Sequence, residues 1–201
     1  MDMPKPTEAH RQLEKLAGTW VGDETLYPSP MDPQGGTATS RMTARVVADG
    51  FALVTDYEQE RGGIVTYRGH GVFTYEPQAG EYVMYWVDSI GSPGETFRGR
   101  LDGSMLAMTS RGAMGSFRLS YDLATPGRLK SRMEMSQDGI NWMPFFDSNY
   151  VPHPPAKAAS AKKAPAKRPP KKPAKATAKT TAMKPMKAKT KPKAKTGKRR
   201  K

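Results

Sequence analysis

The stretch FRLSYDLATPGRLKSRMEM, residues 117–135, decides the fold class, because it holds two strand patterns and the turn between them. Apolar side chains take every second position before Pro126-Gly127, at Phe117, Leu119, Tyr121 and Leu123. Leu129, Met133 and Met135 keep the same two-residue phase after it, alternating with Lys130, Arg132 and Glu134. A period of two is typical of a strand with one buried face, and a Pro-Gly pair between two such runs predicts a hairpin.

The same pattern extends over most of the chain before residue 151. Residues 51–58 and 82–87 alternate in the same way, and turn pairs such as Asp49-Gly50 and Gly62-Gly63 separate the runs. The connections are too short for crossover helices, so about ten strands should form one antiparallel sheet. Closure removes the sheet edges, so we predict an all-β, up-and-down barrel over residues 19–150. At ~10 strands it is wider than a barrel that side chains alone can fill, which leaves room for a cavity.

A short N-terminal segment, residues 1–18, precedes the barrel. Thr7 can cap a helix over residues 7–17, and Gly18 can end it. The apolar face of this helix consists of Ala9, Leu13, Leu16 and Ala17. The capping box is predicted to be incomplete, because His10 occupies the position that usually holds Glu or Gln.

Charge divides the chain into two parts. Residues 151–201 contain 16 Lys, 3 Arg and no acidic residue, so they carry +19. The whole chain carries +14, so residues 1–150 carry −5. Segregation of this kind indicates an acidic folded domain joined to a basic interaction segment.

The basic segment, residues 151–201, consists mainly of Lys, Ala, Pro and Thr. No aromatic residue, Val, Ile or Leu follows Val151, so it cannot bury enough apolar surface to offset the entropy of ordering, and we predict disorder. Lysine contacts phosphate as a point charge, and bases are read mainly by Arg or by stacking aromatics. We therefore predict binding to DNA or RNA without sequence preference. The predicted contacts are Lys162, Lys163, Lys167, Arg168, Lys171, Lys172, Lys175, Lys179, Lys184, Lys187, Lys189, Lys191, Lys193, Lys195, Lys198, Arg199, Arg200 and Lys201.

Repeated Lys-Ala-Pro groups such as Ala164-Pro165-Ala166-Lys167 and Lys171-Lys172-Pro173-Ala174-Lys175 make this segment similar to the tails of linker histones. The resemblance is one of composition, and it implies backbone binding. A solubilising or targeting segment, or binding to another polyanion, would fit the same composition.

Several classes of protein are excluded or disfavoured. The chain has no cysteine, which excludes disulfides, thiolate metal sites and cysteine nucleophiles. His10, His70 and His153 are scattered, so we predict no metal site. No signal-peptide pattern and no run of roughly 20 apolar residues is present, so we expect no membrane span. We expect a cytoplasmic protein associated with the nucleoid, and the oligomeric state stays open.

No catalytic residue is predicted. His70 lies between two glycines and has no evident carboxylate or cysteine partner. Asp56, Glu58 and Glu60 share the strand face opposite Leu53 and Tyr57, which should face solvent.

Eight large side chains are predicted to face the barrel lumen: Tyr57, Phe73, Met84, Trp86, Phe117, Tyr121, Met133 and Trp142. One interpretation is a packed core. The other is a pocket for an apolar or aromatic ligand, to which aromatic rings with polar ends are suited. The sequence leaves both open.

Five separate blocks of sequence carry a resemblance to a known family. They are Leu13–Gly22, Asp49-Gly50-Phe51, Tyr67–Phe73, Tyr82–Trp86 and Ser136–Gly139. Together, over about residues 8–150, they resemble the bacterial family named domain of unknown function 1579. The resemblance implies a calycin-like β-barrel and no assigned activity.

The Gly18-x-Trp20-x-Gly22 core also resembles the start of lipocalins and of the haem-binding nitrobindins. The nitrobindin pattern has glycine where this chain has Glu24, and it has an axial histidine in the last strand, where residues 141–150 have none. We therefore expect no haem and no other cofactor. We interpret Trp20 as a structural ring that closes one end of the barrel.

These observations favour a non-enzymatic barrel that holds a small apolar ligand and is tethered to nucleic acid by its basic segment. The first alternative is an enzyme acting on a small molecule inside the barrel, which would require a polar lumen residue with a displaced pKa. The second is a passive interaction module with a filled core and a solubilising tail.

Overall fold

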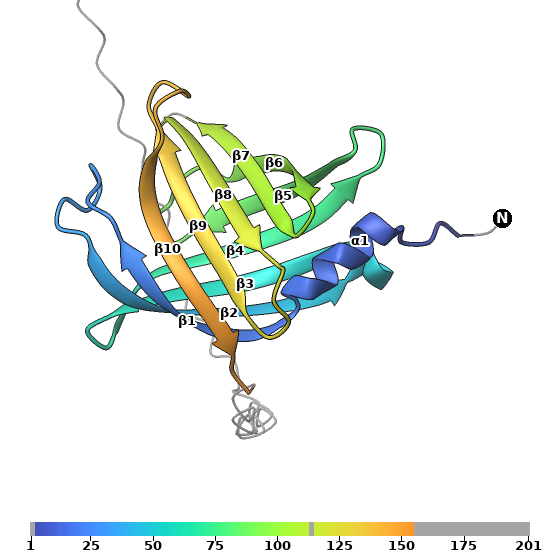
Figure 1. Ribbon diagram of the computed structural model, residues 1–201, viewed down its shortest axis with the longest axis horizontal. Coiled ribbons are helices and arrows are strands. Elements are labelled where there is room, and N and C mark those ends of the chain that lie inside the picture. Colours follow the sequence, from blue (N-terminus) through green and yellow to red (C-terminus); the bar gives the residue numbers. More distant parts are fainter. Residues whose placement is uncertain (1–2, 113–114, 155–201) are drawn as a thin grey trace, which may run out of the picture. The chain divides into compact units, whose positions relative to one another are not determined.

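The computed structural model describes residues 3–112 and 115–154, which form three short helical segments and ten strands (Figure 1). The N-terminal segments are α1 (Glu8–Gln12) and the 3-10 turn η1 (Leu13–Leu16). The strands are β1 (Gly18–Leu26), β2 (Gly36–Val47), β3 (Ala52–Arg61), β4 (Ile64–Glu76), β5 (Glu81–Asp88), β6 (Glu95–Asp102), β7 (Met105–Gly112), β8 (Gly115–Asp122), β9 (Leu129–Ser136) and β10 (Met143–Pro152), with a 3-10 turn η2 (Ala48–Gly50) between β2 and β3. The predicted nucleic-acid-binding residues, Lys162 to Lys201, lie outside the described residues.

The ten strands form one closed antiparallel barrel, as the alternation predicts. Each strand pairs with its neighbours in the sequence, and β1 pairs with β10 to close the barrel, from Trp20 opposite Pro152 to Leu26 opposite Phe146. The last strand continues past Tyr150, the predicted end of the barrel, to Pro152.

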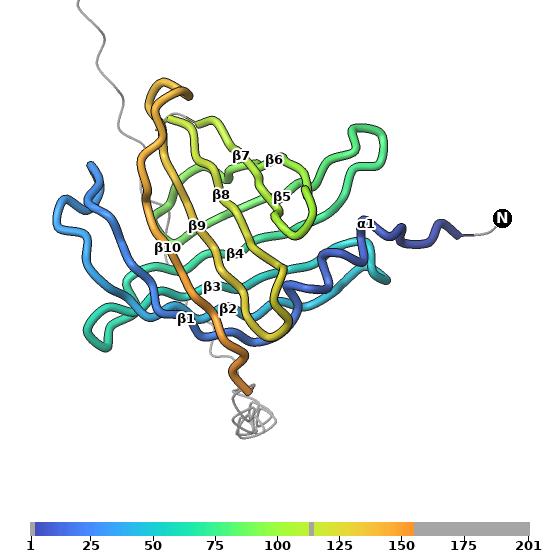
Figure 2. Tube along the Cα trace, viewed as in Figure 1, coloured from blue at the N-terminus to red at the C-terminus, as the bar shows by residue number. Residues whose placement is uncertain are grey.

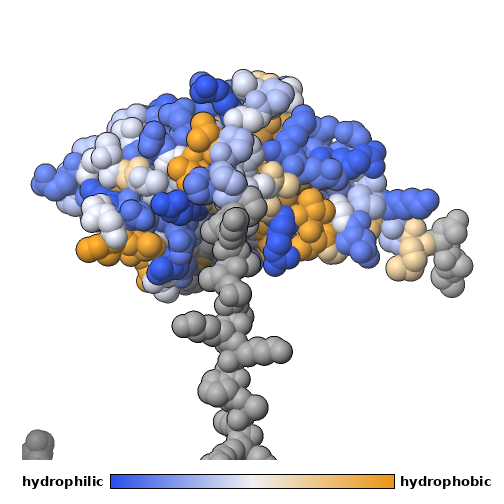
Figure 3. All heavy atoms as spheres, turned by 90° about the horizontal axis from the view of Figure 1, so that it is seen from below, coloured by the Kyte–Doolittle hydropathy of each residue, from blue (hydrophilic) through white to orange (hydrophobic). Residues whose placement is uncertain are grey.

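Inward-facing side chains from all ten strands form a single core. Its most deeply buried members include Leu53, Phe73, Met84, Leu106, Met108 and Leu129. The outer positions are mostly hydrophilic, with a few apolar patches between them on the face drawn in Figure 3. This division of residues is the consequence of the period-two pattern on a closed sheet.

One end of the barrel is sealed by α1 and η1. Leu13 and Leu16 are buried in the core with Trp20, whose indole N–H donates to the backbone carbonyl of Leu16 at 2.9 Å. The hydroxyl of Tyr82 on β5 donates to the carbonyl of Ala9 at 3.0 Å, which ties the helix to the far side of the barrel. The interpretation of Trp20 as a closing ring is confirmed.

The helical segment differs from the prediction in its cap and in its length. The α-helix ends at Gln12, and the chain continues as the 3-10 turn to Leu16. The ring nitrogen Nδ1 of His10 accepts a hydrogen bond from the backbone N–H of Thr7 at 3.2 Å. His10 therefore makes the hydrogen bond of the capping box that runs from the N3 side chain to the N-cap backbone. The prediction of an incomplete box was wrong, because a neutral imidazole nitrogen can accept a hydrogen bond as Glu or Gln does.

The opposite end of the barrel is open. The β1–β2, β3–β4, β5–β6 and β9–β10 connections lie there, and Figure 2 shows the β1–β2 connection (blue) on the side of the barrel away from α1. Arg61, at the end of β3, donates to the side chain of Asp32 and to the backbone carbonyl of Gly35, which fixes the β1–β2 connection at this end.

Candidate ligand-binding pocket

A pocket of about 250 Å³ opens between the β1–β2 and β5–β6 connections at the open end. Seven aromatic side chains line it, namely Tyr27, Tyr67, Trp86, Phe97, Phe117, Phe145 and Phe146. Its other walls are Leu26, Ser29, Met31, Asp32, Gln59, Asp88, Ile90, Ser92, Glu95 and Met133. The pocket is concave and mostly apolar, with a few polar groups, which is the usual composition of a small-molecule site.

Strand alternation and one irregularity bring these side chains together. Trp86 and Asp88 are in phase with the buried Met84 on β5, so all three face the lumen. The pairing of β10 with β9 shifts between Pro144 and Phe146. An irregularity of this kind breaks the alternation, and both Phe145 and Phe146 line the pocket although they are adjacent in the sequence.

Two glycines of β4 make room for the ring of Trp86. A Cβ atom on Gly69 would lie 1.9 Å from Cζ2 of the indole, and one on Gly71 would lie 3.1 Å from its Cε3. The indole therefore lies directly against the backbone of β4. The Gly-His-Gly sequence at residues 69–71 is explained by this contact, because any side chain at Gly69 would displace the ring.

A chain of hydrogen bonds crosses the pocket wall. The indole N–H of Trp86 donates to the hydroxyl oxygen of Tyr67 at 3.0 Å, and this hydroxyl donates to the Asp88 carboxylate at 3.2 Å. Burial raises the pKa of Tyr67 well above its usual value, so the phenol keeps its proton and remains a donor.

A buried carboxylate lies deeper in the barrel, behind Gln59. Glu24 is 2% exposed, and the amide of Gln59 donates to its Oε2 at 2.7 Å. The hydroxyl of Tyr57 lies 2.9 Å from both carboxylate oxygens, and Ser148 also donates to Oε1. Three donors satisfy this group, which is how a buried carboxylate is normally accommodated.

The tyrosines around Glu24 are held in their neutral form. Burial, with a contribution from the Glu24 charge, raises the pKa of Tyr57 well above its usual value. Burial likewise raises the pKa of Tyr150 to about 12. A raised pKa makes a tyrosine a poorer proton donor in catalysis, so this cluster is suited to fixing the lumen rather than to acid–base chemistry.

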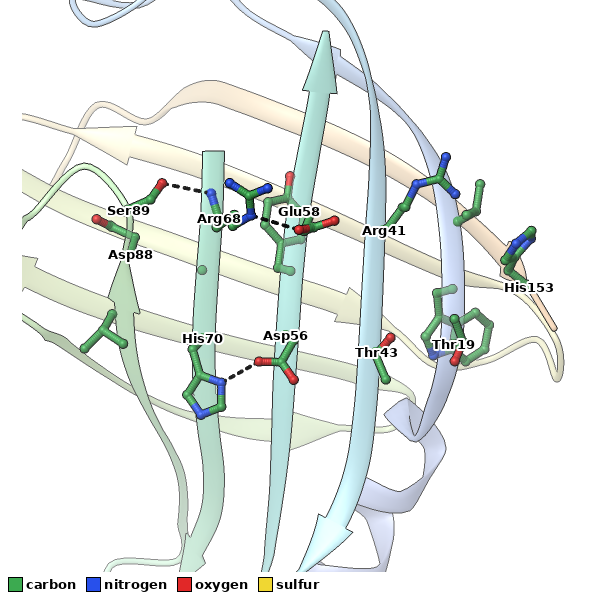
Figure 4. Close-up of a pocket in the computed structure, with 15 residues that line it drawn as sticks. Thr19, Arg41, Thr43, Asp56, Glu58, Arg68, His70, Asp88, Ser89 and His153 are labelled. Atoms are coloured by element: carbon green, nitrogen blue, oxygen red, sulfur yellow. Dashed lines mark hydrogen bonds and ion pairs between the residues drawn. The ribbon is translucent and has the colours of Figure 1, made fainter. Parts of the chain in front are cut away.

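A larger hollow of about 760 Å³ lies on the outer face of β1–β5 (Figure 4). Arg68 pairs with Glu58 at 2.8 Å, and Nδ1 of His70 lies 2.8 Å from Oδ1 of Asp56. The expectation that His70 has no carboxylate partner was wrong, since β3 and β4 place the two residues directly opposite each other. Both pairs are exposed to solvent, and the charges of Arg68 and Glu58 compensate each other, so the hollow has the character of an ordinary polar surface.

The eight residues predicted to face the lumen lie in four different places. Trp86, Phe117 and Met133 line the pocket. Phe73, Met84 and Tyr121 lie in the buried core, and Tyr57 contacts Glu24. Trp142 lies in the β9–β10 connection with the guanidinium of Arg118 4.5 Å above its ring, on the outer face of β8, because the strand ends at Ser136 before the alternation reaches it.

Sequence reasoning did not single out Glu24, Gln59, Asp88 or Glu95. For three of them, the strand phase contained a signal. Glu24 follows Trp20 and Gly22 at the same period, Gln59 follows Tyr57, and Asp88 follows Trp86. A polar residue in this phase still lies on the inner face, because phase decides which face of the sheet a side chain occupies.

Other kinds of site find little support in residues 3–112 and 115–154. No three His, Asp or Glu side chains there are grouped so that they could hold a metal ion. No helix of this part of the chain is long and apolar enough to cross a membrane.

Comparisons with known proteins agree with this fold. A family model described as "Protein of unknown function (DUF1579)" matches residues 5–151. No curated protein matches the chain. The crystal structure of Rv2717c from M. tuberculosis superimposes with a TM-score of 0.56 at 14% identity, covering 74% of this chain and 99% of that one. The S-type phycobiliprotein lyase CPES from Guillardia theta gives 0.53 at 12% identity, covering 74% and 94%. At such identities the likeness shows the fold alone.

Proposed function

Because the chain belongs to the DUF1579 family, whose description assigns no activity, we propose a function from the barrel itself: it binds a small, largely apolar ligand in the pocket at its open end. The observation that carries the proposal is the pocket of about 250 Å³, which is lined by seven aromatic side chains. This volume is just below the roughly 300–1,000 Å³ usual for ligand pockets, so the ligand is small.

Two further observations support binding rather than catalysis. Among the described residues, every fully buried side-chain nitrogen or oxygen already has a hydrogen-bond partner. The tyrosines nearest Glu24 have raised pKa values and keep their protons. A solved structure with this fold is named a phycobiliprotein lyase, which supports the use of such barrels for small molecules as well as the alternative of an enzyme.

The test is native mass spectrometry of the full chain purified gently from cells, compared with its denatured mass. We expect a stoichiometric excess mass in the native state. The Phe145→Leu variant, which alters a pocket wall, should lose it, whereas Tyr85→Leu on the outer face should retain it. If the full chain retains no mass, and neither the neutral naphthalen-1-ylmethanol nor the cationic naphthalen-1-ylmethylamine binds in the pocket, the proposal is wrong.

The basic segment supports a second proposal, that the barrel is tethered to nucleic acid without sequence preference. It rests on the +19 charge of residues 151–201. The affinity of the full chain for duplex DNA should fall about 10³–10⁵-fold between 50 and 200 mM salt if 6–10 phosphates are contacted. Replacing the lysines from Lys162 to Lys201 with glutamine should abolish binding. Affinity that survives this change, or that is independent of salt, would contradict the tether.

A further inference from the structure

The lining of the open-end pocket has an unequal distribution of charge. Asp88 and Glu95 are half-buried and face the pocket, and neither has an ion-pair partner among the described residues. The third acidic residue of the lining, Asp32, is neutralised by Arg61. The lining contains no Lys, Arg or His. A pocket with acidic groups and no basic ones repels anions and attracts cations.

The polar hydrogens of the wall are largely engaged already. The Trp86 N–H donates to Tyr67, whose hydroxyl donates to Asp88. The hydroxyl of Tyr27 donates to Asp147, and the Gln59 amide donates to Glu24. The other side-chain donors of the lining are the hydroxyls of Ser29 and Ser92 on the two connections. What the deeper wall still offers a ligand is hydrogen-bond acceptors.

The aromatic residues of the pocket also favour a cationic ligand. Aromatic faces carry negative electrostatic potential, and Trp gives the strongest attraction for a cation within about 6 Å of the ring. Trp86 pairs across the strands with Glu95. The ring of Trp86 is also held in place against Gly69, so its face is fixed rather than free to turn away. An ammonium group at this position would meet a carboxylate and an aromatic wall together.

We propose that the ligand of this pocket is a small organic cation, an aromatic or apolar amine whose ammonium group binds beside Glu95 and Asp88. The inference rests on the proposed ligand-binding function and specifies its ligand class. Carboxylated ligands of similar size are excluded, because they would place a negative charge beside these two carboxylates without a cation to receive it.

Three probes of one shape and different charge test the inference with the full chain. They are naphthalen-1-ylmethylamine, which is cationic at neutral pH, the neutral naphthalen-1-ylmethanol, and naphthalene-1-carboxylate. Binding is followed by the ¹³C-methyl NMR signals of methionine. Met133 lines the pocket, and Met183 and Met186 report any anion that binds to the basic segment instead. Substitution of Met133 by leucine assigns its signal.

We expect the amine to shift the Met133 signal and to bind about tenfold more tightly than the alcohol, with the carboxylate giving no shift there. The preference should weaken as salt is added, since the site is open to solvent. The variant Asp88→Asn/Glu95→Gln should bind both probes nearly equally. Asp102→Asn, which removes one negative charge at the far end of the barrel, should keep the preference.

Each other outcome overturns the inference in a distinguishable way. If the alcohol binds at Met133 as tightly as the amine, or if the carboxylate binds there, the pocket takes ligands but does not select cations. If the preference persists in the double variant, Asp88 and Glu95 are not its source. If none of the probes shifts Met133, the pocket does not bind such ligands, and the proposed function fails with the inference.

Discussion

At the sealed end of the barrel Trp20 is 7% exposed, and its indole N–H donates to the backbone carbonyl of Leu16. At the open end Trp86 is half-buried, and its indole N–H donates to the side chain of Tyr67. The first ring is surrounded by Leu13 and Leu16 of the helical segment, whereas the second borders a cavity. The same residue type is thus part of the core at one end and part of a candidate binding surface at the other, and the difference is whether a helical segment covers it.

The largest effect should come from removing each ring. Trp20→Ala should lower the free energy of unfolding by about 3–5 kcal/mol, the usual cost of a large buried side chain. Trp86→Ala should cost less than half of that, because the space it leaves joins an existing pocket. Denaturant unfolding measures both, with the exposed Ile140→Ala as the control. Equal losses of unfolding free energy for the two variants would contradict the difference between the two ends.

A second effect tests the lumen between the two ends. The unfolded chain ionises Tyr150 near its usual pKa of about 10, whereas burial raises the folded value to about 12. Stability from this group is therefore complete below pH 10 and is lost as the pH rises toward 12. The loss should be about 2–3 kcal/mol, since each pKa unit corresponds to 1.36 kcal/mol.

Unfolding free energies measured from pH 9 to 12 check this expectation. The variant Tyr150→Phe should have a distinctly shallower decline than the unmodified chain. The control is Tyr85→Phe, at an exposed outer position, which should leave the decline unchanged. If the unfolding free energy declines with the same slope in all three chains, ionisation of Tyr150 does not contribute to the loss of stability at high pH.

The contact between the Trp86 ring and the backbone at Gly69 gives a third test. Gly69→Ala should cost about 1–3 kcal/mol through overpacking, because the new methyl group would lie within the indole ring. The cost should largely disappear in the Trp86→Leu background, where the ring is absent. Gly112→Ala is the matched control, because its Cβ would lie 3.4 Å from the nearest atom, an ordinary contact. A cost that persists without the ring would place its origin in the β4 backbone.

The smallest effect concerns pH at the sealed end. Burial lowers the pKa of His10 below its usual 6.5, so the folded state disfavours the protonated ring. The groups around it are the rings of Phe51 and Tyr75 and the backbone N–H and hydroxyl of Thr7. Stability from His10 is therefore present above pH 6.5 and is lost as the pH falls below it.

His10→Gln keeps an acceptor for the cap and removes the titration. Unfolding free energies between pH 7 and 5 should fall less steeply in this variant than in the unmodified chain. Binding of the neutral probe at Met133 should not change in either chain, since the pocket is at the other end of the barrel. A coupled change in binding would show that the two ends are not independent.

The sequence predicts the fold more completely than the site. The alternation at residues 117–135 and the short turns are sufficient for a closed antiparallel barrel, because phase and connection length leave few other arrangements. The site depends on how far each inward residue lies from the ends. Phe73 and Trp86 have similar patterns, but one is in the core and the other lines the pocket.

Two features of the pocket had no clear sequence signal. The register shift on β10 that brings both Phe145 and Phe146 to the pocket is a property of strand pairing, which no local pattern records. The role of Gly69 becomes evident only when Trp86 of the next strand is placed against it. Both depend on contacts between strands, and such contacts are fixed by the register of the whole sheet.

The pairing of β1 with β10 sets a condition on how this chain can be synthesised. Residues 18–26 find their second neighbour only in residues 143–152, so the barrel cannot close until nearly the whole domain has left the ribosome. Until then β1 and β9 each present an unpaired edge to other nascent chains. A closed barrel has no exposed strand edges once it is complete, but two edges are exposed during translation until the last strand has been made.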